Sequence, residues 1–204
     1  MYRFSPAIEK NRAKMIAFAK EQSFAMIIGI GDEYPAASQI PLEIIEERDQ
    51  LFFSGHLMRK TDHHLAFEKN NHVLIIFTGP HAYIDANWYE DPKSGSTVNY
   101  MAVHAKGTIQ FTDTAGTRAA VKQITDEKIG KGTAASFDQL PEEYIDRMVK
   151  AIVGFKITVK EIEAVFALSR GKSVDDQKNI IAQLEKRNTG GDAFIPEKMK
   201  ALLP

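Results

Sequence analysis

The sequence YMAVHAKGTIQF, residues 100–111, alternates between two kinds of side chain. The odd-numbered positions are apolar or small, namely Met101, Val103, Ala105, Gly107, Ile109 and Phe111. Most of the residues between them are polar, among them His104, Lys106 and Gln110. A period of two residues is typical of a β-strand with one buried and one solvated face. The stretch therefore predicts a long strand that packs one face on a hydrophobic core.

Shorter β-prone stretches lie on both sides of this strand. They cover residues 23–31, 34–41, 43–47, 51–55 and 73–80, and most end in Gly, Pro or Asp turn signals. Their close succession favours antiparallel pairing over parallel βαβ units. From Phe155 to Val159 the apolar residues are odd-numbered, whereas from Ile162 to Leu168 they are even-numbered. Such a change of phase predicts a bulge or a tight corner, as in a closing barrel.

Helical patterns flank these strands. Apolar residues recur at helical spacing in five stretches, residues 9–22, 62–69, 115–129, 142–148 and 173–187. A Thr-Gly-Gly linker and a short segment then end the chain. We therefore predict a mainly β, α+β fold, a small β-barrel with flanking helices. We expect one domain over residues 1–188 and a short C-terminal tail over 189–204.

The composition excludes several classes of protein. The 204 residues include 26 Lys and Arg against 27 Asp and Glu, a net charge of −1, which argues against nucleic-acid binding by bulk charge. There is no cysteine, so disulfides, thiolate metal sites and a cysteine nucleophile are excluded. The N-terminus lacks the apolar core of a signal peptide, and the longest apolar run, Phe24 to Ile30, is too short to span a bilayer. We expect a cytoplasmic protein with no membrane partner.

The segment FFSGHLMRKTDHHL, residues 52–65, carries the clearest chemical signal. A strand ends in small residues, two cations follow, Arg59 and Lys60, and a helix begins directly after them. Free N–H groups at a helix start attract anions, and an arginine can donate two hydrogen bonds to one phosphate. Ser54 can add a hydroxyl donor, and Gly55 allows a close backbone approach. The pattern predicts a site for one phosphate group, although a solvated basic turn would look the same.

Other sites are less well supported. The adjacent His63 and His64 point about 100° apart on a helix, and there is no HExxH pattern, so we predict no metal site. We name no catalytic residue, because no nucleophile elbow is present and the paired carboxylates look solvated. No helix-turn-helix with a basic recognition helix is evident, so direct nucleic-acid binding is not supported. Trp88, in a polar loop, fits either a flat ligand or partner or a core anchor.

A series of motifs resembles the PaiB-type family, called FMN-binding negative transcriptional regulators. The motifs occur in order from residue 1 to about residue 184: Met1-Tyr2, GHLMR at 55–59, GPHAYI at 79–84, Trp88-Tyr89, VNY at 98–100, VHAKG at 103–107 and Leu168-Ser169. The family is similar to the flavin-binding split barrels of the pyridoxamine phosphate oxidase type. The chain departs from the family pattern at Gln39-Ile40-Pro41, where His-Leu-Pro is usual.

The resemblance implies an FMN-binding split β-barrel that is a homodimer with flavin at the subunit interface. Ser54, Arg59 and Lys60 fall on the family's phosphate pattern, and Gln39 to Pro41 would border the ring. Trp88, Asn99 and Tyr100 would close the site from the partner chain. The cofactor-binding positions implied are thus Gln39, Ile40, Pro41, Phe53, Ser54, Gly55, His56, Arg59, Lys60, Trp88, Asn99 and Tyr100.

Three functions remain open at the level of the sequence. The first is an FMN-binding negative transcriptional regulator of the PaiB type. The second is an FMN-dependent oxidoreductase that acts on a small-molecule substrate, in which the flavin carries the redox chemistry. The third is a cofactor-free dimeric interaction module. Flavin absorbance of the purified protein separates the first two from the third, and reduction by NAD(P)H with substrate turnover separates the second from the first.

Overall fold

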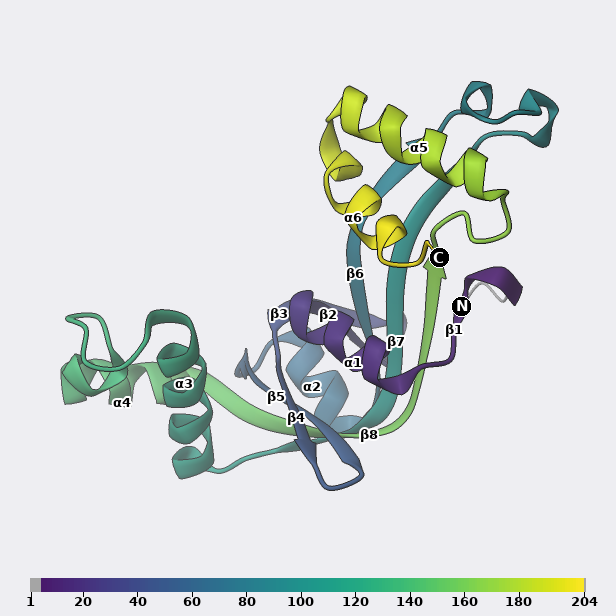
Figure 1. The fold of residues 1–204 in the computed structure, drawn as a ribbon. Helices are drawn as coiled ribbons and strands as arrows, with labels where there is room; N and C mark the ends of the chain where they lie inside the picture. Colours follow the sequence, from purple (N-terminus) through teal and green to yellow (C-terminus); the bar gives the residue numbers. More distant parts are fainter. Residues whose placement is uncertain (1–4, 204) are drawn as a thin grey trace. The chain divides into compact units, whose positions relative to one another are not determined.

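The structure is a computed structural model that describes residues 5–203, and these residues form two compact units. The first unit comprises Met1–Met15, Thr78–His104 and Glu163–Pro204, and the second comprises Ile16–Phe77 and Ala105–Ile162. Three long strands contribute residues to both units, β6 (His72–Ile84), β7 (Thr97–Phe111) and β8 (Ile152–Ala167) (Figure 1). The division into one domain and a tail stays a prediction.

The described residues contain an eight-stranded sheet with the order β3-β2-β6-β7-β8-β5-β4, in which β1 also pairs with β8. The shorter strands are β1 (Ile8–Glu9), β2 (Phe24–Gly29), β3 (Ala36–Pro41), β4 (Glu43–Glu47) and β5 (Gln50–Met58). The pairings of β1 with β8, β2 with β3 and β6, and β5 with β4 and β8 are antiparallel. The predicted α+β fold with antiparallel strands is therefore confirmed.

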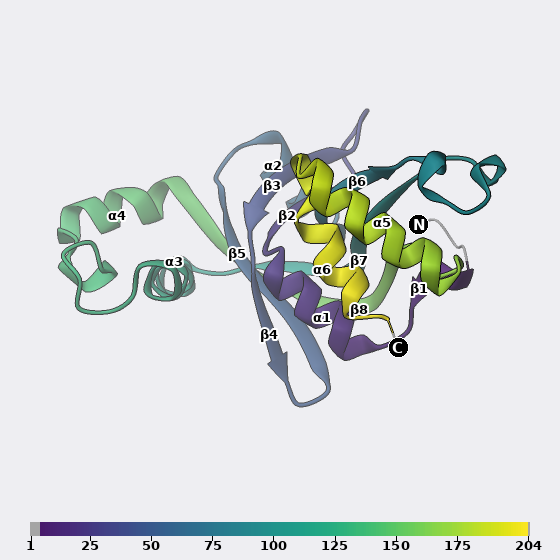
Figure 2. The same ribbon diagram turned by 45° about the horizontal axis from the view of Figure 1, so that its top comes forward.

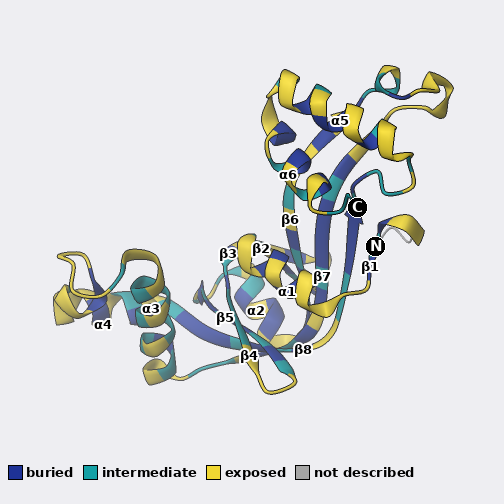
Figure 3. Ribbon diagram, in the orientation of Figure 1, coloured by how far each residue is buried: buried dark blue, intermediate teal, exposed yellow. Residues whose placement is uncertain are grey.

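The alternation that predicted the long strand is visible in its burial. Figure 3 shows that much of β7 is buried. Val103, Ala105 and Ile109 are at most 2% exposed, whereas His104 and Thr108 are half-buried and Lys106 is exposed. In β8, Val153, Phe155, Ile157 and Val159 are buried at odd positions, whereas the consecutive residues Ala164, Val165 and Phe166 are all buried. The alternation therefore ends where the strand leaves the second unit after Ile162, and the residues beyond are buried on both faces. One strand thus serves two cores.

Helices of the second unit cover the sheet locally. Helix α2 (Asp62–Lys69) packs Phe67 on Gly29 of β2, where an added Cβ would lie 2.5 Å from the Phe67 ring. Helices α3 (Thr114–Ile129) and α4 (Glu142–Ala151) share a small core of their own, built from Val121, Phe137, Ile145 and Val149. Helix α1 (Arg12–Glu21) begins three residues later than the predicted start, because Glu9 pairs with Ala164 in β1.

Two helices of the first unit lie side by side, α5 (Val174–Arg187) and α6 (Phe194–Lys200) (Figure 2). The Ser173 side chain caps α5 by accepting the N–H of Asp176. Ile195 and Met199 of α6 are at most 1% exposed. The segment expected as a tail therefore contains a short helix with a buried face. No helix within residues 5–203 is both long and apolar enough to cross a bilayer.

Candidate functional site

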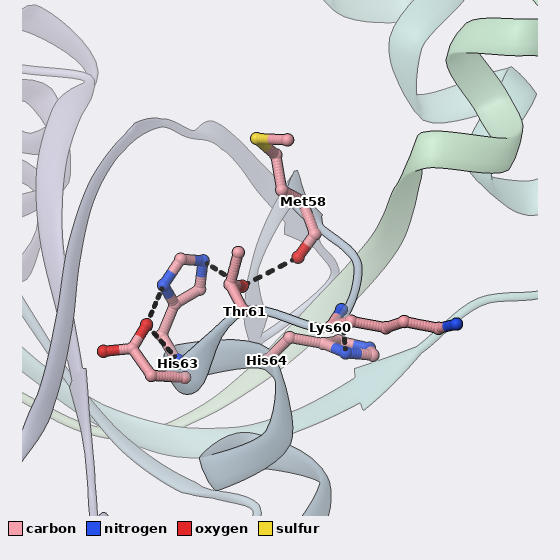
Figure 4. A network of polar contacts seen from close by, with 6 residues as sticks. Met58, Lys60, Thr61, His63 and His64 are labelled. Carbon is pink, nitrogen blue, oxygen red and sulfur yellow. Dashed lines mark hydrogen bonds and ion pairs between the residues drawn. The ribbon is translucent and has the colours of Figure 1, made fainter.

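The segment between β5 and α2, which contains Arg59 and Lys60, makes a tight corner (Figure 4). The Arg59 N–H donates to the Ala151 carbonyl at 2.9 Å, which extends the pairing of β5 with β8 by one bond. Lys60 then adopts a left-handed φ of +61°, which is uncommon for a residue other than glycine. Its N–H donates to Nδ1 of the buried His64 at 3.2 Å. The backbone of the corner is therefore fixed from both sides.

The first turn of α2 lacks a side-chain cap. Thr61 occupies the N-cap position, but its hydroxyl donates to the Met58 carbonyl at 2.9 Å and contacts His63 Nε2 at 3.0 Å. The Asp62 carboxylate accepts the His63 N–H at 2.8 Å. Uncapped N–H groups carry the positive end of the helix dipole. The start of α2 therefore keeps an anion-attracting field, which Asp62 partly offsets.

Both cations at the corner lack a carboxylate partner within the part of the chain that the structure describes. Arg59 is half-buried and Lys60 is exposed, and Figure 4 shows the Lys60 side chain extending away from His63. Two unpaired cations beside an uncapped helix suit a doubly charged phosphate. The residues present thus fit the phosphate of FMN, and the bound flavin would supply redox chemistry.

The predicted residues of β5 divide between its two faces. Phe53 and Gly55 face the core, where an added Cβ on Gly55 would lie 2.8 Å from the Phe155 ring. The requirement for glycine there comes from this packing. Ser54 lies on the opposite face, directly between Glu43 of β4 and Lys156 of β8 in the register. The structure thus gives Ser54 one acidic and one basic neighbour.

His56 shares the outer face of β5 with Ser54 and pairs with Gly154 of β8. Its Nδ1 is buried and has no hydrogen-bond partner among the described residues. Burial lowers the pKa of His56 below its ordinary value. The ring is therefore neutral at pH 7 and can either donate or accept one hydrogen bond.

Gln39, Ile40 and Pro41 alternate across β3. Ile40 is 8% exposed and faces the core beside Ala25, whereas Gln39 pairs with Met26 on the outer face. Pro41 shares that face and pairs with Phe24, which is 63% exposed. Of the three predicted ring contacts, Gln39 and Pro41 are thus the two with accessible side chains.

The last three predicted residues belong to the first unit. The Arg187 guanidinium of α5 lies over the Trp88 ring, 5.0 Å from the ring centre. The flat group that packs on Trp88 is therefore this guanidinium. Asn99 is 1% exposed and accepts a hydrogen bond from the Ser169 hydroxyl at 3.0 Å. Tyr100 is half-buried. Their contacts with flavin stay predictions.

A carboxylate pair next to β5 was not foreseen from the sequence. Burial first, and then the charge and a hydrogen bond of Glu127, raise the pKa of Glu43 to about 7. Gln123 of α3 also donates a hydrogen bond to Glu43. The register of β4 could not be read from the pattern, so no local signal would have found this pair. No cluster of three or more metal-ligating side chains occurs within residues 5–203.

Comparisons with known proteins show the family of the chain. The family described as "Putative FMN-binding domain" matches residues 1–161. Protease synthase and sporulation protein PAI 2 of Bacillus subtilis is 30% identical over 192 residues, which is 93% of this chain and 92% of that protein. An uncharacterized protein of Aspergillus fumigatus is 28% identical over 155 residues, 65% of this chain and 59% of that protein.

Two solved structures show the same fold. The flavocytochrome Anf3 from Azotobacter vinelandii has a TM-score of 0.62 at 12% identity, covering 81% of this chain and 72% of that chain. The FAD and heme binding protein from Mycobacterium smegmatis has a TM-score of 0.61 at 13% identity, covering 84% and 78%. Because the family match spans most of the chain and PAI 2 is similar over nearly its whole length, the chain is a member of the PaiB-type FMN-binding family with a split-barrel fold.

Proposed function

We propose that the chain is a homodimeric flavoprotein that regulates transcription in an FMN-dependent way, with the flavin phosphate at the Arg59–Lys60 corner. The observation that carries the proposal is a pair of cations without carboxylate partners beside the uncapped start of α2. Arg59 is half-buried without a counter-charge among the described residues, which costs stability, and the exposed Lys60 repels it, so such a pair is expected where a ligand supplies negative charge. The regulatory role is the one implied by resemblance to the PaiB-type family.

The phosphate assignment is tested by FMN titration of three variants. Replacing both Arg59 and Lys60 by Ala should weaken binding by two orders of magnitude or more, because each charge-assisted contact contributes ~1.5–3 kcal/mol. Asp62→Asn should tighten binding roughly two- to fivefold, because it removes a negative charge worth ~0.3–1 kcal/mol at the helix start. Lys69→Ala, at the other end of α2, is the control and should leave the affinity unchanged. Wild-type affinity in the double variant would refute the assignment.

The exposed face of β2 supports the proposed homodimer, because it can serve as the interface between two copies of the chain. Phe24 and Met26 are 63% and 37% exposed, and Ile28 lies on the same face. The register continues this face onto Leu74 and Ile76 of β6 and onto the predicted ring neighbours Gln39 and Pro41 of β3. Contiguous apolar sheet surface on a soluble fold is typical of a protein interface. A dimer through this face would place Gln39 and Pro41 at the boundary between subunits.

Light scattering tests the dimer. Replacing Phe24 and Met26 together by Glu should give a monomer, because charges would be buried unpaired at the interface. The matched control is Tyr34→Glu, which changes another residue, 78% exposed, beyond the end of β2. A dimeric double variant would show that the interface lies elsewhere.

Transcript profiling tests the regulatory role. In a deletion strain, the wild-type gene should restore repression, and the Arg59 and Lys60 double variant should not. Equal repression by the wild type and the double variant would show that regulation does not require flavin binding at this corner. If the flavin is instead reduced by NAD(P)H with steady turnover of a small substrate, an oxidoreductase replaces the regulator.

A further inference from the structure

A pocket of about 520 Å³ lies in the first unit, whereas the flavin corner belongs to the second. Its lining comes from the N-terminal segment, the loop before β7 and the segment after β8. The residues that matter for its chemistry are Pro6, Tyr89, Val98, Leu168, Arg170 and Lys172. The volume is within the range of small-molecule sites.

Two residues that line this pocket each carry a buried hydrogen-bond donor without an acceptor. Tyr89 is 5% exposed, and its Oη has no hydrogen-bond partner among the described residues. The same holds for Nε of Arg170. The great majority of buried polar atoms in folded proteins have a partner, so each exception requires an explanation. Two such donors in one pocket point to a ligand that brings the acceptor.

The Arg170 guanidinium is held in place by its other nitrogens. Nη2 donates to the carbonyls of Ala7 at 3.2 Å and Phe166 at 3.3 Å. Nη1 lies 3.6 Å from the carboxylate of Glu9. Three partners therefore fix the plane of the group and leave Nε available. Glu9 also balances the charge of Arg170, so this residue provides orientation more than net charge.

Lys172 supplies the net positive charge. Its Nζ lies 3.9 Å from the centre of the Tyr89 ring, and no carboxylate pairs with it within residues 5–203. The cation–π contact holds the ammonium beside the phenol. Burial and nearby negative charge raise the pKa of Tyr89, so the phenol keeps its proton and remains a donor. The pocket thus joins a cation and two neutral or balanced donors.

The wall that carries these groups is rigidly held. The Ser169 hydroxyl donates to Asn99 Oδ1 at 3.0 Å, and Asn99 Nδ2 contacts Met199 Sδ at 3.4 Å. Gln177 Nε2 donates to the Lys172 carbonyl at 2.9 Å. Donors fixed before binding lose little entropy when a ligand arrives. The remaining lining includes the apolar side chains of Pro6, Ala7, Val98, Val165, Ala167 and Leu168.

We propose that this pocket binds a small organic anion, a monocarboxylate with an apolar body. Its carboxylate accepts hydrogen bonds from Tyr89 Oη and Arg170 Nε beside the charge of Lys172. The apolar part of the ligand covers the aliphatic lining. The inference does not depend on the Arg59–Lys60 corner, because every residue it uses belongs to the first unit. The lining also includes Asn99 and Tyr100, which the family resemblance assigns to the flavin, so the test must separate the two ligands.

Calorimetric titration of the full chain, saturated with FMN, with sodium benzoate tests the proposal. Benzoate should bind, and the neutral benzyl alcohol should bind at least tenfold more weakly, since charge-assisted bonds are about twice as strong as neutral ones. Tyr89→Phe removes one oxygen and should weaken benzoate roughly five- to tenfold. Lys172→Gln should weaken it by a similar factor. Tyr144→Phe is the matched control, because Tyr144 is 44% exposed, belongs to the second unit and is absent from the pocket lining.

Three results would overturn the proposal. One is the absence of benzoate binding, and another is unchanged affinity in both Tyr89→Phe and Lys172→Gln. The third is binding of benzoate to the flavin-free chain but not to the chain saturated with FMN, which would assign the pocket to the flavin. The Arg59 and Lys60 double variant should bind benzoate as the wild type does, so failure of the flavin corner would be seen separately. A thermal unfolding midpoint close to that of the wild type confirms that Tyr89→Phe is folded.

Discussion

Nδ1 of His64 accepts the backbone N–H of Lys60 at 3.2 Å, which ties the first turn of α2 to the residue that turns the chain out of β5. His64 is 5% exposed, and its ring meets the Phe111 ring edge-on at 4.8 Å. Packing in the core therefore fixes the His64 ring, and the hydrogen bond to its Nδ1 stabilises Lys60 in the left-handed conformation. A buried histidine thus positions a cation that is itself exposed.

His64→Phe should weaken FMN binding about fivefold. The new ring keeps the aromatic packing but accepts no hydrogen bond, and a lost backbone bond costs ~1 kcal/mol. The effect should appear in fluorescence titration of FMN. His72→Phe, at an exposed position at the start of β6, should leave binding unchanged. Equal FMN affinity in wild type and His64→Phe would show that the corner keeps its shape without this bond.

Gly55→Ala should destabilise the fold by about 1–3 kcal/mol, as overpacking of a core does. Its Cβ would lie 2.8 Å from the Phe155 ring and 3.2 Å from both a Leu42 methyl group and the Pro41 carbonyl. Urea unfolding measures the loss. Gly171→Ala is the control, because its nearest neighbours would be Pro6 atoms at 3.6 and 3.8 Å. An unchanged free energy of unfolding in Gly55→Ala would mean that β5 and β8 can move apart to accommodate the added methyl group.

The Glu43–Glu127 pair should make stability fall as the pH rises. The pKa of Glu43 is about 7 in the folded chain, against an ordinary value of 4.5. The folded state therefore binds the proton more tightly, and its advantage is lost between about pH 4.5 and 7. Glu43→Gln should remove this slope and be about 1 kcal/mol more stable than wild type at pH 8, after discounting for solvent screening.

Urea unfolding at pH 4.5 and pH 8 checks the difference. Glu127→Gln should reduce the same slope, because its charge is the second cause of the raised pKa. If Glu43→Gln gains the same stability at both pH values, the added stability comes from the amide group and not from the loss of the negative charge.

Asp192→Asn should cost about 1.5–3 kcal/mol, because the Arg187 guanidinium loses its counter-charge but remains 32% exposed to water. Asp192 is 1% exposed and accepts from Arg187 Nε at 2.7 Å and from Nη2 at 2.6 Å. The Arg187 hydrogen bond lowers the pKa of Asp192 to about 2, so the pair stabilises above pH 3.8 and weakens as the pH falls towards 2.

Chemical denaturation at pH 7 and pH 2.5 measures the Asp192 effect, which should shrink at the lower pH. The control is Asp175→Asn, on the exposed first turn of α5. If Asp192→Asn loses little stability at pH 7, the apolar face of α6 is sufficient to hold α6 against α5.

The sequence by itself determined the strands, most helices and the two cations at the corner between β5 and α2. Alternation along a strand reflects which side chains leave water, and this is a local property that β7 displays directly. Arg59 and Lys60 could be found because all parts of the corner are contiguous in the chain. The start of α1 was placed too early, because a strand pairing between Glu9 and a residue far along the chain is invisible locally.

Only the tertiary structure decided which faces and which distant groups meet. Register assigned Phe53, Gly55 and Ile40 to the core and Ser54, Gln39 and Pro41 to the opposite faces of their strands. It also paired Glu43 with α3 and gathered Tyr89, Arg170 and Lys172 from separate segments around one pocket. A single-residue shift in register reverses the face of every side chain, and the energy that selects the register comes from packing between segments distant in sequence.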